Sequence, residues 1–197
     1  MTKIYLFIWL LFISSQLAMA KISEDSVAIK KQTFQYYISP ILDFNPLVEQ
    51  YFSSAGLSAG LIYKSHYNVE IFAQSLMWDL RKRLIFPNDY ALTQRQAGLV
   101  LQYIVNPDAD FNFGFGAKGG VGYLAWDQVE GNDRYEDIVW VIRPQVFLEW
   151  SLSKYLKIGA SAGYSHTSQL EIFGLDEGDL DGFSSSIYLK LGRFNKR

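Results

Sequence analysis

Apolar and polar residues alternate along most of this chain, so that every second side chain is hydrophobic over long stretches. The clearest of these stretches begin at Phe34, Phe111, Trp140 and Leu156. Alternation with a period of two residues is the signature of a β-strand with one apolar face. The pattern predicts eight strands, over residues 33–44, 53–64, 68–80, 91–105, 110–126, 137–150, 155–168 and 181–194.

The predicted connections alternate between short and long. Short connections follow the second, fourth and sixth strands, at residues 65–67, 106–109 and 151–154. Long polar connections follow the third, fifth and seventh strands, at residues 81–90, 127–136 and 169–180. Short turns on one rim and long loops on the other are typical of a transmembrane barrel of the bacterial outer membrane. We therefore predict an all-β, eight-stranded, antiparallel up-and-down barrel, with both chain ends on the short-turn, periplasmic rim.

The two faces of the predicted strands indicate which side meets lipid. The polar face carries mixed charges that suit the filled interior of a narrow barrel: Lys118, Arg143, Glu149, Lys157 and Lys190. The apolar face carries Trp140 and Trp150, which at about 3.3 Å per residue and a tilt near 45° stand roughly 23 Å apart, close to the height of the lipid-facing band. A secreted barrel of the lipocalin type would reverse the faces, but the Gly-x-Trp opening strand and terminal helix of that class are missing from the sequence.

The first residues are typical of a secretory signal peptide. An apolar run from Ile4 to Ile13 follows Lys3, and Ala18 and Ala20 are the small residues expected at the cleavage site. The run is too short for a transmembrane helix, which needs about 20 apolar residues. We expect a signal peptide over residues 1–20, a short periplasmic segment over 21–32 and a barrel domain over 33–197.

The composition excludes several classes of protein. The 197 residues contain no cysteine, which excludes a disulfide framework, a thiolate metal site and a lipoprotein anchor. A formal net charge of −2 provides no basic surface for nucleic acid. A content of 16% aromatic residues argues against intrinsic disorder.

The chain resembles the small eight-stranded outer-membrane barrels of Gram-negative bacteria, the OmpA/OmpX type. The resemblance covers the whole chain after the signal peptide and implies an outer-membrane location, without implying an activity. The ending from Tyr188 to Phe194 is similar to the terminal strand that the barrel-assembly machinery reads. Phe194 has the opposite parity to Leu189 and Leu191, which predicts a bulge near Gly192.

The segment 164–168, Tyr-Ser-His-Thr-Ser, resembles the motif of the outer-membrane lipid A deacylases, which are also eight-stranded barrels. The resemblance implies that His166 is a general base for a Ser168 nucleophile on the lipid-facing wall, with a carboxylate on the neighbouring strand. Our candidate for that carboxylate is Glu177, with Asp179 and Asp181 also open. The family has Asn after its serine, whereas this chain has Gln169.

An acidic segment precedes the eighth strand. Its carboxylates are a weak candidate for a Ca²⁺ or Mg²⁺ site: Asp176, Glu177, Asp179 and Asp181. A solvated charged loop explains the same residues. The basic triplet 81–83 could contact lipopolysaccharide phosphates, or serve as a basic rim at the membrane surface.

Three functions remain open at this point. The first is a structural or surface-contact barrel acting through its long loops, and the second is a lipid A esterase. The third is a narrow channel, suggested by six inward glycines beside Lys118: Gly114, Gly116, Gly120, Gly122, Gly159 and Gly163. For all three we expect a monomer without a cofactor, whose partners are outer-membrane lipid, lipopolysaccharide and the barrel-assembly machinery.

Overall fold

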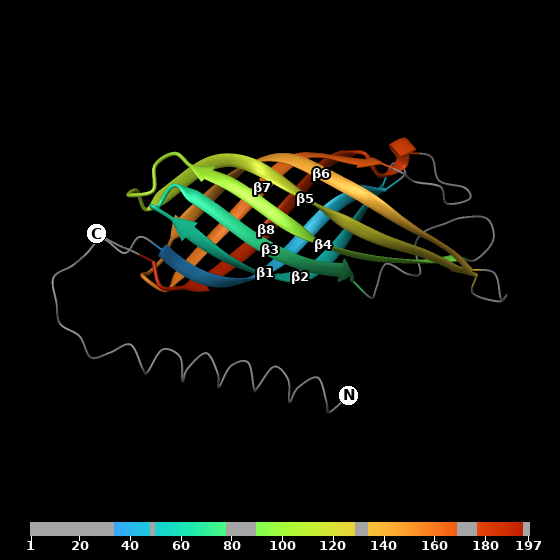
Figure 1. Ribbon diagram of the computed structural model, residues 1–197, viewed down its shortest axis with the longest axis horizontal. Helices are drawn as coiled ribbons and strands as arrows, with labels where there is room; N and C mark the ends of the chain where they lie inside the picture. Colours follow the sequence, from blue (N-terminus) through green and yellow to red (C-terminus); the bar gives the residue numbers. More distant parts are fainter. Residues whose placement is uncertain (1–33, 48–49, 78–89, 129–133, 169–176, 195–197) are drawn as a thin grey trace, which may run out of the picture. The chain divides into compact units, whose positions relative to one another are not determined.

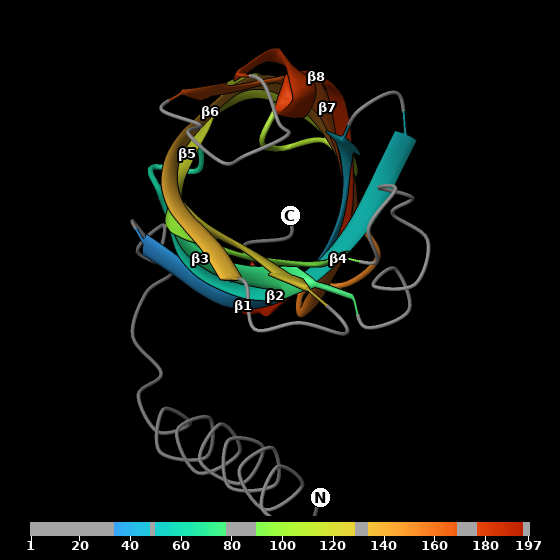
Figure 2. The ribbon, with the colours of Figure 1, turned by 90° about the vertical axis from the view of Figure 1, so that its right-hand side faces the viewer.

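The computed structural model describes residues 34–47, 50–77, 90–128, 134–168 and 177–194. These residues form a closed antiparallel barrel in which each strand pairs with its neighbours in sequence and β1 pairs with β8 (Figures 1 and 2). The strands are β1 Phe34–Leu47, β2 Gln50–Tyr63, β3 Tyr67–Leu76, β4 Tyr90–Ile104, β5 Phe111–Gln128, β6 Arg134–Ser151, β7 Leu156–Ser168 and β8 Gly182–Gly192. The predicted fold is confirmed. The predicted signal peptide and the segment 21–32 lie outside the described residues.

The strands are strongly staggered around the barrel. Following partnered residues once around the wall from Tyr63 on β2 leads back to Ser53 on the same strand, ten positions away. A closed barrel needs such a stagger because its strands tilt relative to the axis. We call the end with the β2–β3, β4–β5 and β6–β7 connections the turn end, and the opposite end the loop end. A 3-10 helix, η2 (Glu177–Leu180), lies at the loop end (Figure 1).

Several strands differ in length from the prediction. The pairing of β1 with β2 continues to Leu47 and Gln50, so the first hairpin is tight. β5 and β6 also run past their predicted ends, because Asp127 still pairs with Arg134, and only residues 129–133 separate the two strands. The predicted loop 127–136 was therefore too long. β3 ends at Leu76 rather than at residue 80, and most of the predicted loops 81–90 and 169–180 lie outside the described residues.

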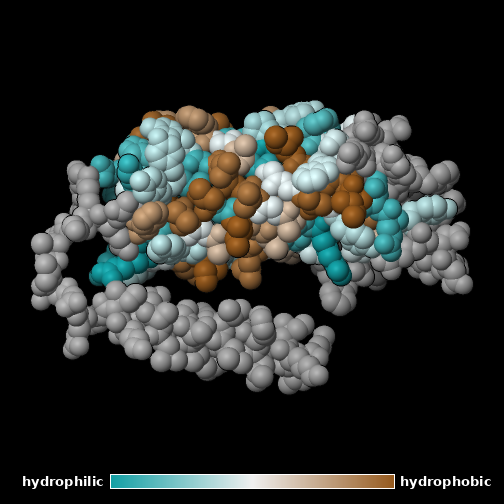
Figure 3. All heavy atoms as spheres, in the orientation of Figure 1, coloured by the Kyte–Doolittle hydropathy of each residue, from teal (hydrophilic) through white to brown (hydrophobic). Residues whose placement is uncertain are grey.

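The outer wall is apolar, as the alternation predicted. Trp140 and Trp150 are 55% and 46% exposed, and the other outward positions include Ile142, Leu148 and Phe183. On the face shown in Figure 3, hydrophobic residues gather over the middle of the wall. Within the described residues, no helix is long and apolar enough to cross a membrane.

Side chains fill the interior in layers. The turn end is closed by an apolar cluster made of Tyr37, Ile62, Ile104, Phe147 and Phe194. A second apolar cluster lies farther along the barrel and contains Ile41, Phe72, Val100 and Tyr188. Buried charged and amide side chains surround these clusters, so the polar face points inward as predicted.

The expected bulge near Gly192 is not present. β8 keeps one register with β1 as far as Gly192 and with β7 as far as Leu191. Because the register is unbroken, Phe194 retains inward parity, and its ring is only 4% exposed. The Phe194 amide donates a hydrogen bond of 2.8 Å to the carbonyl of Lys154, which fixes the end of the chain against the last turn. Phe194 therefore packs from inside the barrel into the apolar cluster at the turn end.

Gly60 leaves the space that the Tyr37 ring occupies. A Cβ at Gly60 would lie 2.5 Å from Cζ and Oη of Tyr37, whose hydroxyl donates to Glu70 at 2.6 Å and lies 2.9 Å from Asn68 Oδ1. We expect Gly60→Ala to lower the free energy of unfolding by about 1–3 kcal/mol, because the ring cannot move without breaking these contacts. Urea unfolding followed by tryptophan fluorescence measures the change. The control is Gly178→Ala, whose Cβ would meet nothing within 4 Å; equal stability of the two variants would contradict the prediction.

Candidate functional site

The structure brings His166 and Asp181 together on the outside of the barrel near the loop end. His166 lies on the outward face of β7, and Asp181 comes directly before β8. Nδ1 of His166 lies 2.6 Å from Oδ2 of Asp181, and the Thr167 amide donates to Oδ1 of the same carboxylate at 2.6 Å. Two contacts therefore fix the Asp181 carboxylate. The His166 side chain is 60% exposed and that of Asp181 only 18%.

This arrangement suits an oriented base. A carboxylate on Nδ1 of an imidazole fixes the ring and its tautomer, so that Nε2 can accept a proton from a nucleophile. Ser168 lies two residues further along β7 on the same face, and its Cα partner on β6 is Trp140. No hydrogen bond joins Ser168 to His166 within the described part of the chain. Such contacts often tighten only when substrate binds.

The sequence nominated Glu177 as the acid, whereas the structure places Asp181 against His166. The side chain of Glu177 lies outside the described residues, as do Gln169 and Asp176. Among the described side chains, no three of the types His, Asp and Glu gather as metal ligands. The metal candidate thus rests on Asp176 and Glu177, of whose side chains the structure says nothing, and it stays a prediction.

A first buried charge network lies inside the barrel toward the loop end. Nζ of Lys118 donates to Oδ2 of Asp43 at 2.6 Å and to the amide oxygen of Gln74 at 2.8 Å. The Arg143 guanidinium lies 3.5 Å from the same Asp43 oxygen and also donates to Asn45. Asp43 is completely buried. The alternation placed Asp43 on the inward face, but nothing in the sequence pairs it with residues so distant along the chain.

A second buried network lies toward the turn end. Glu149 accepts hydrogen bonds from Nζ of Lys190 and, at 3.1 Å, from the Tyr188 hydroxyl, and Lys157 lies 3.7 Å away. Nearby, Tyr37 donates to Glu70. These contacts use the inward cations that the sequence identified. We treat them as structural rather than catalytic candidates, because these side chains are buried inside the barrel.

The described part of the interior gives no support to the third predicted function, a narrow channel, which stays a prediction. A cavity lined by Glu70, Lys118 and Tyr188, among others, has a volume of about 20 Å³. That is room for about one water molecule. At Gly114, one of the inward glycines, an added Cβ would lie 2.5 Å from Cζ of Phe147, so the phenyl ring occupies the space beside this glycine. The remaining histidine, His66, is structural, with its ring stacked on Tyr103 and Nδ1 2.9 Å from the Ile104 carbonyl.

Comparison with known proteins identifies the fold. No family model matches the sequence, and no curated protein matches it either. Neisserial surface protein A (NspA) has a similar structure, with a TM-score of 0.55 and 10% identity over 81% of this chain and 97% of that chain. The N-terminal β-barrel domain of OprF from Pseudomonas aeruginosa has a TM-score of 0.54 and 8% identity, over 82% of this chain and 98% of that chain. Ail, the attachment invasion locus protein of Yersinia pestis, has a TM-score of 0.51 and 11% identity, over 81% of this chain and 96% of that chain. The predicted resemblance to small eight-stranded outer-membrane barrels is confirmed at the level of fold.

Proposed function

We propose that this protein is an integral outer-membrane barrel with a structural or surface-interaction role. The supporting observation is a barrel wall whose outward side chains are apolar around a filled, polar interior, the reverse of a water-soluble protein. A closed barrel satisfies every backbone group within lipid. Two similar barrels are named as a surface protein and an attachment protein. In our proposal the loop end faces the outside, both chain ends are periplasmic, and the long loops make the surface contacts.

The absence of native cysteine permits a clean test of this orientation. We expect Gly178→Cys, at the loop end, to react with a membrane-impermeant maleimide in intact cells. Lys154→Cys, at the turn end, should react only after the envelope is permeabilised. Both positions are exposed, so burial does not explain a difference between them. Labelling of Lys154→Cys alone in intact cells would overturn the orientation, and recovery of the protein outside the outer membrane would overturn the location.

The contact of 2.6 Å between His166 and Asp181 favours a second candidate, a lipid A ester hydrolase. In that reaction Ser168 Oγ would attack an acyl ester carbonyl while Nε2 of His166 takes the hydroxyl proton. The proton would then pass to the leaving alkoxide, and water would release the fatty acid from the acyl-serine. A serine hydroxyl requires such an adjacent base. The two candidates share one location and differ in whether His166 is needed.

Incubating the refolded protein with lipid A and following acyl-chain loss by mass spectrometry separates them. If the protein is a hydrolase, we expect the loss of one acyl chain from lipid A. His166→Ala should lower the rate of acyl-chain loss by at least about 10³-fold. Asp181→Asn should lower the same rate by on the order of 10⁴-fold. The matched control is His66→Ala, the other histidine, which lies at the turn end. No acyl loss from a barrel shown to be folded by its heat-modifiable gel mobility would discard the hydrolase. Shortening the long loops should then change surface binding while His166→Ala does not.

A further inference from the structure

A groove runs across the outer wall over strands β2 to β6. Its volume is about 860 Å³, within the range of roughly 300–1,000 Å³ typical of ligand pockets. Three of its lining residues are alanines, namely Ala55, Ala73 and Ala97, one each from β2, β3 and β4. Larger apolar side chains line the rest: Leu57, Val121, Tyr123 and Ile138. The groove is therefore a shallow, mainly apolar depression in the outer wall.

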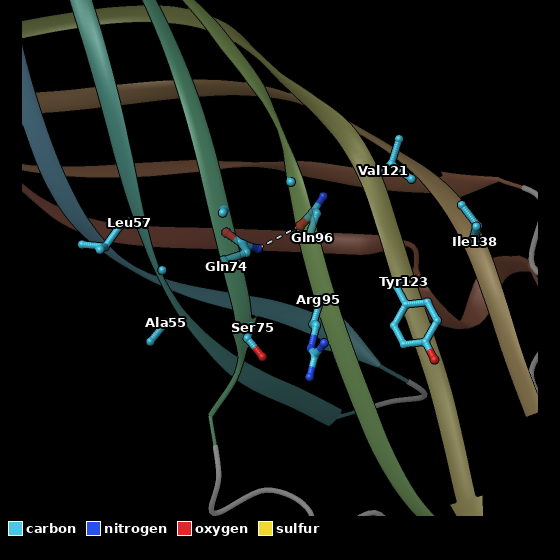
Figure 4. A pocket seen from close by; sticks show the side chains of 12 residues that line it. Ala55, Leu57, Gln74, Ser75, Arg95, Gln96, Val121, Tyr123 and Ile138 are labelled. Carbon is cyan, nitrogen blue, oxygen red and sulfur yellow. Dashed lines mark hydrogen bonds between the residues drawn. The ribbon is translucent and has the colours of Figure 1, made fainter. Parts of the chain in front are cut away.

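The groove has a closed back. Behind it, Nε2 of Gln74 donates a hydrogen bond of 2.8 Å to Oε1 of Gln96, which ties the inner faces of β3 and β4 together (Figure 4). β3 and β4 also pair without a break from Tyr67 to Ser75, so the sheet itself separates the groove from the barrel interior. A ligand would enter it from the surrounding membrane.

Arg95 gives this apolar groove a positive charge. Its side chain is exposed on the outward face, although the neighbouring outward positions on β4, Ala97 and Leu99, are apolar. Its direct partners across the sheet are Ser75 on β3 and Tyr123 on β5. Figure 4 shows the Arg95 guanidinium and the Tyr123 hydroxyl extending in the same direction along the wall. Three polar side chains thus stand together in one row of the sheet.

The positive charge of Arg95 on the outward face of the barrel would be stabilised by a bound anion. A charged side chain on the lipid face of a barrel is unfavourable to a degree that depends on its depth. Among the ion pairs of the described residues, none involves Arg95. Arg95 lies in the half of β4 nearer the loop end, since the strand begins there at Tyr90. A phosphate in the headgroup layer at that end would match the bidentate geometry of the guanidinium.

We propose that this groove is a binding site for lipid A of the outer leaflet, with one acyl chain along Ala55, Ala73 and Ala97 and a phosphate on Arg95. The assignment to the outer leaflet rests on the orientation proposed above. The chemistry follows from the wall itself: an apolar groove beside a single cation, Arg95, and two hydroxyl-bearing side chains, Ser75 and Tyr123. The site is separate from His166, which lies on β7, and does not require any hydrolysis.

Native mass spectrometry of the refolded protein in nonionic micelles, titrated with lipid A, tests the site. We expect Arg95→Ala to weaken binding about tenfold or more, because a charge-assisted contact is lost. Ala97→Phe should weaken it similarly by filling the groove. The matched controls are Arg193→Ala, which removes an exposed arginine beyond β8, and Ala160→Phe, which adds the same ring to the outward face of β7. The controls should bind as the unaltered protein does.

Each other outcome overturns the proposal in a distinct way. Equal lipid A binding by all four variants would mean that the groove is not the site. Equally tight, Arg95-dependent binding of phosphatidylglycerol would make the ligand an anionic phospholipid instead of lipid A. A dimer mass that disappears in Ala97→Phe would make the groove a contact between two copies. Lipid A binding is measured in micelles, whereas the orientation is measured by maleimide labelling in cells. A failure of lipid A binding can therefore be distinguished from a failure of the proposed orientation.

Discussion

Replacing Asp43 with alanine is expected to lower the free energy of unfolding by about 3–5 kcal/mol. Asp43 is completely buried and is shared by Lys118, at 2.6 Å, and Arg143, at 3.5 Å. Its removal leaves both cations in the barrel interior without a carboxylate. Denaturant unfolding of the protein in lipid vesicles, followed by tryptophan fluorescence, measures the loss. Asp108→Ala, which removes an exposed acid from a turn, is the control and should lower stability much less, because its carboxylate is exposed rather than buried.

A combined variant shows whether the loss comes from unpaired charge. Removing Asp43 together with Lys118 and Arg143, as Asp43→Ala, Lys118→Met and Arg143→Met, should cost less than Asp43→Ala alone. Apolar replacement of a whole buried ion network is often neutral, whereas breaking the network leaves an uncompensated charge. A combined cost equal to or greater than that of Asp43→Ala would contradict this explanation.

Replacing Phe194 with alanine should cost a similar amount, about 3–5 kcal/mol. The Phe194 ring lies in the apolar cluster at the turn end, and its centroid is 6.3 Å from the centroid of the Tyr37 ring. Nζ of Lys157 lies 4.9 Å from the centroid of the Phe194 ring. Truncation would leave a cavity in that cluster and remove the aromatic face next to a buried cation. The measurement is again unfolding of protein refolded into vesicles, where no assembly machinery acts. Any effect is then separate from the predicted role of the last strand as an assembly signal.

Phe183 on β8 provides the matched control. It is the same residue type, but it points outward and is 64% exposed, whereas Phe194, two residues beyond β8, is 4% exposed. Phe183→Ala should therefore lower stability much less than Phe194→Ala. Equal losses would show that the turn-end cluster adds nothing beyond the contacts that any aromatic side chain makes at the wall.

Parity along the strands was enough to predict the fold and the contents of the interior. It placed Lys118 and Arg143 inside and Trp140 outside, because one face of each strand must be apolar in lipid. Parity does not determine which inward residues meet, since partners depend on the stagger between strands. The pairing of Asp43 with Lys118 therefore appears only in the structure. For the same reason, the contact between Asp181 and His166 appears only in the structure.

Arg95 was missed because its immediate neighbours hide it. Gln94 and Gln96 are both inward and polar, so the segment reads as three polar residues in a row and the alternation is weak there. Continuing the apolar parity back from Leu101 through Leu99 and Ala97 does reach Arg95. A charge on lipid-facing parity is the signal that would have identified it. The groove beside it could not be predicted, because it depends on which residues of β2, β3 and β4 lie side by side: Ala73 pairs with Ala97, and Ala55 pairs with Ser75.

The first buried network joins residues that are synthesised far apart in time. Lys118 follows Asp43 by 75 positions, and Arg143 follows Asn45 by 98. An assembly intermediate that contains only the first four strands holds a carboxylate on β1 whose cations have yet to arrive. Such partial sheets gain little until β5 and β6 add their strands, so the barrel should form in one late, cooperative step, and slowly, as expected when contacts are distant in sequence. The charges that stabilise the complete barrel therefore make each partly assembled barrel unstable.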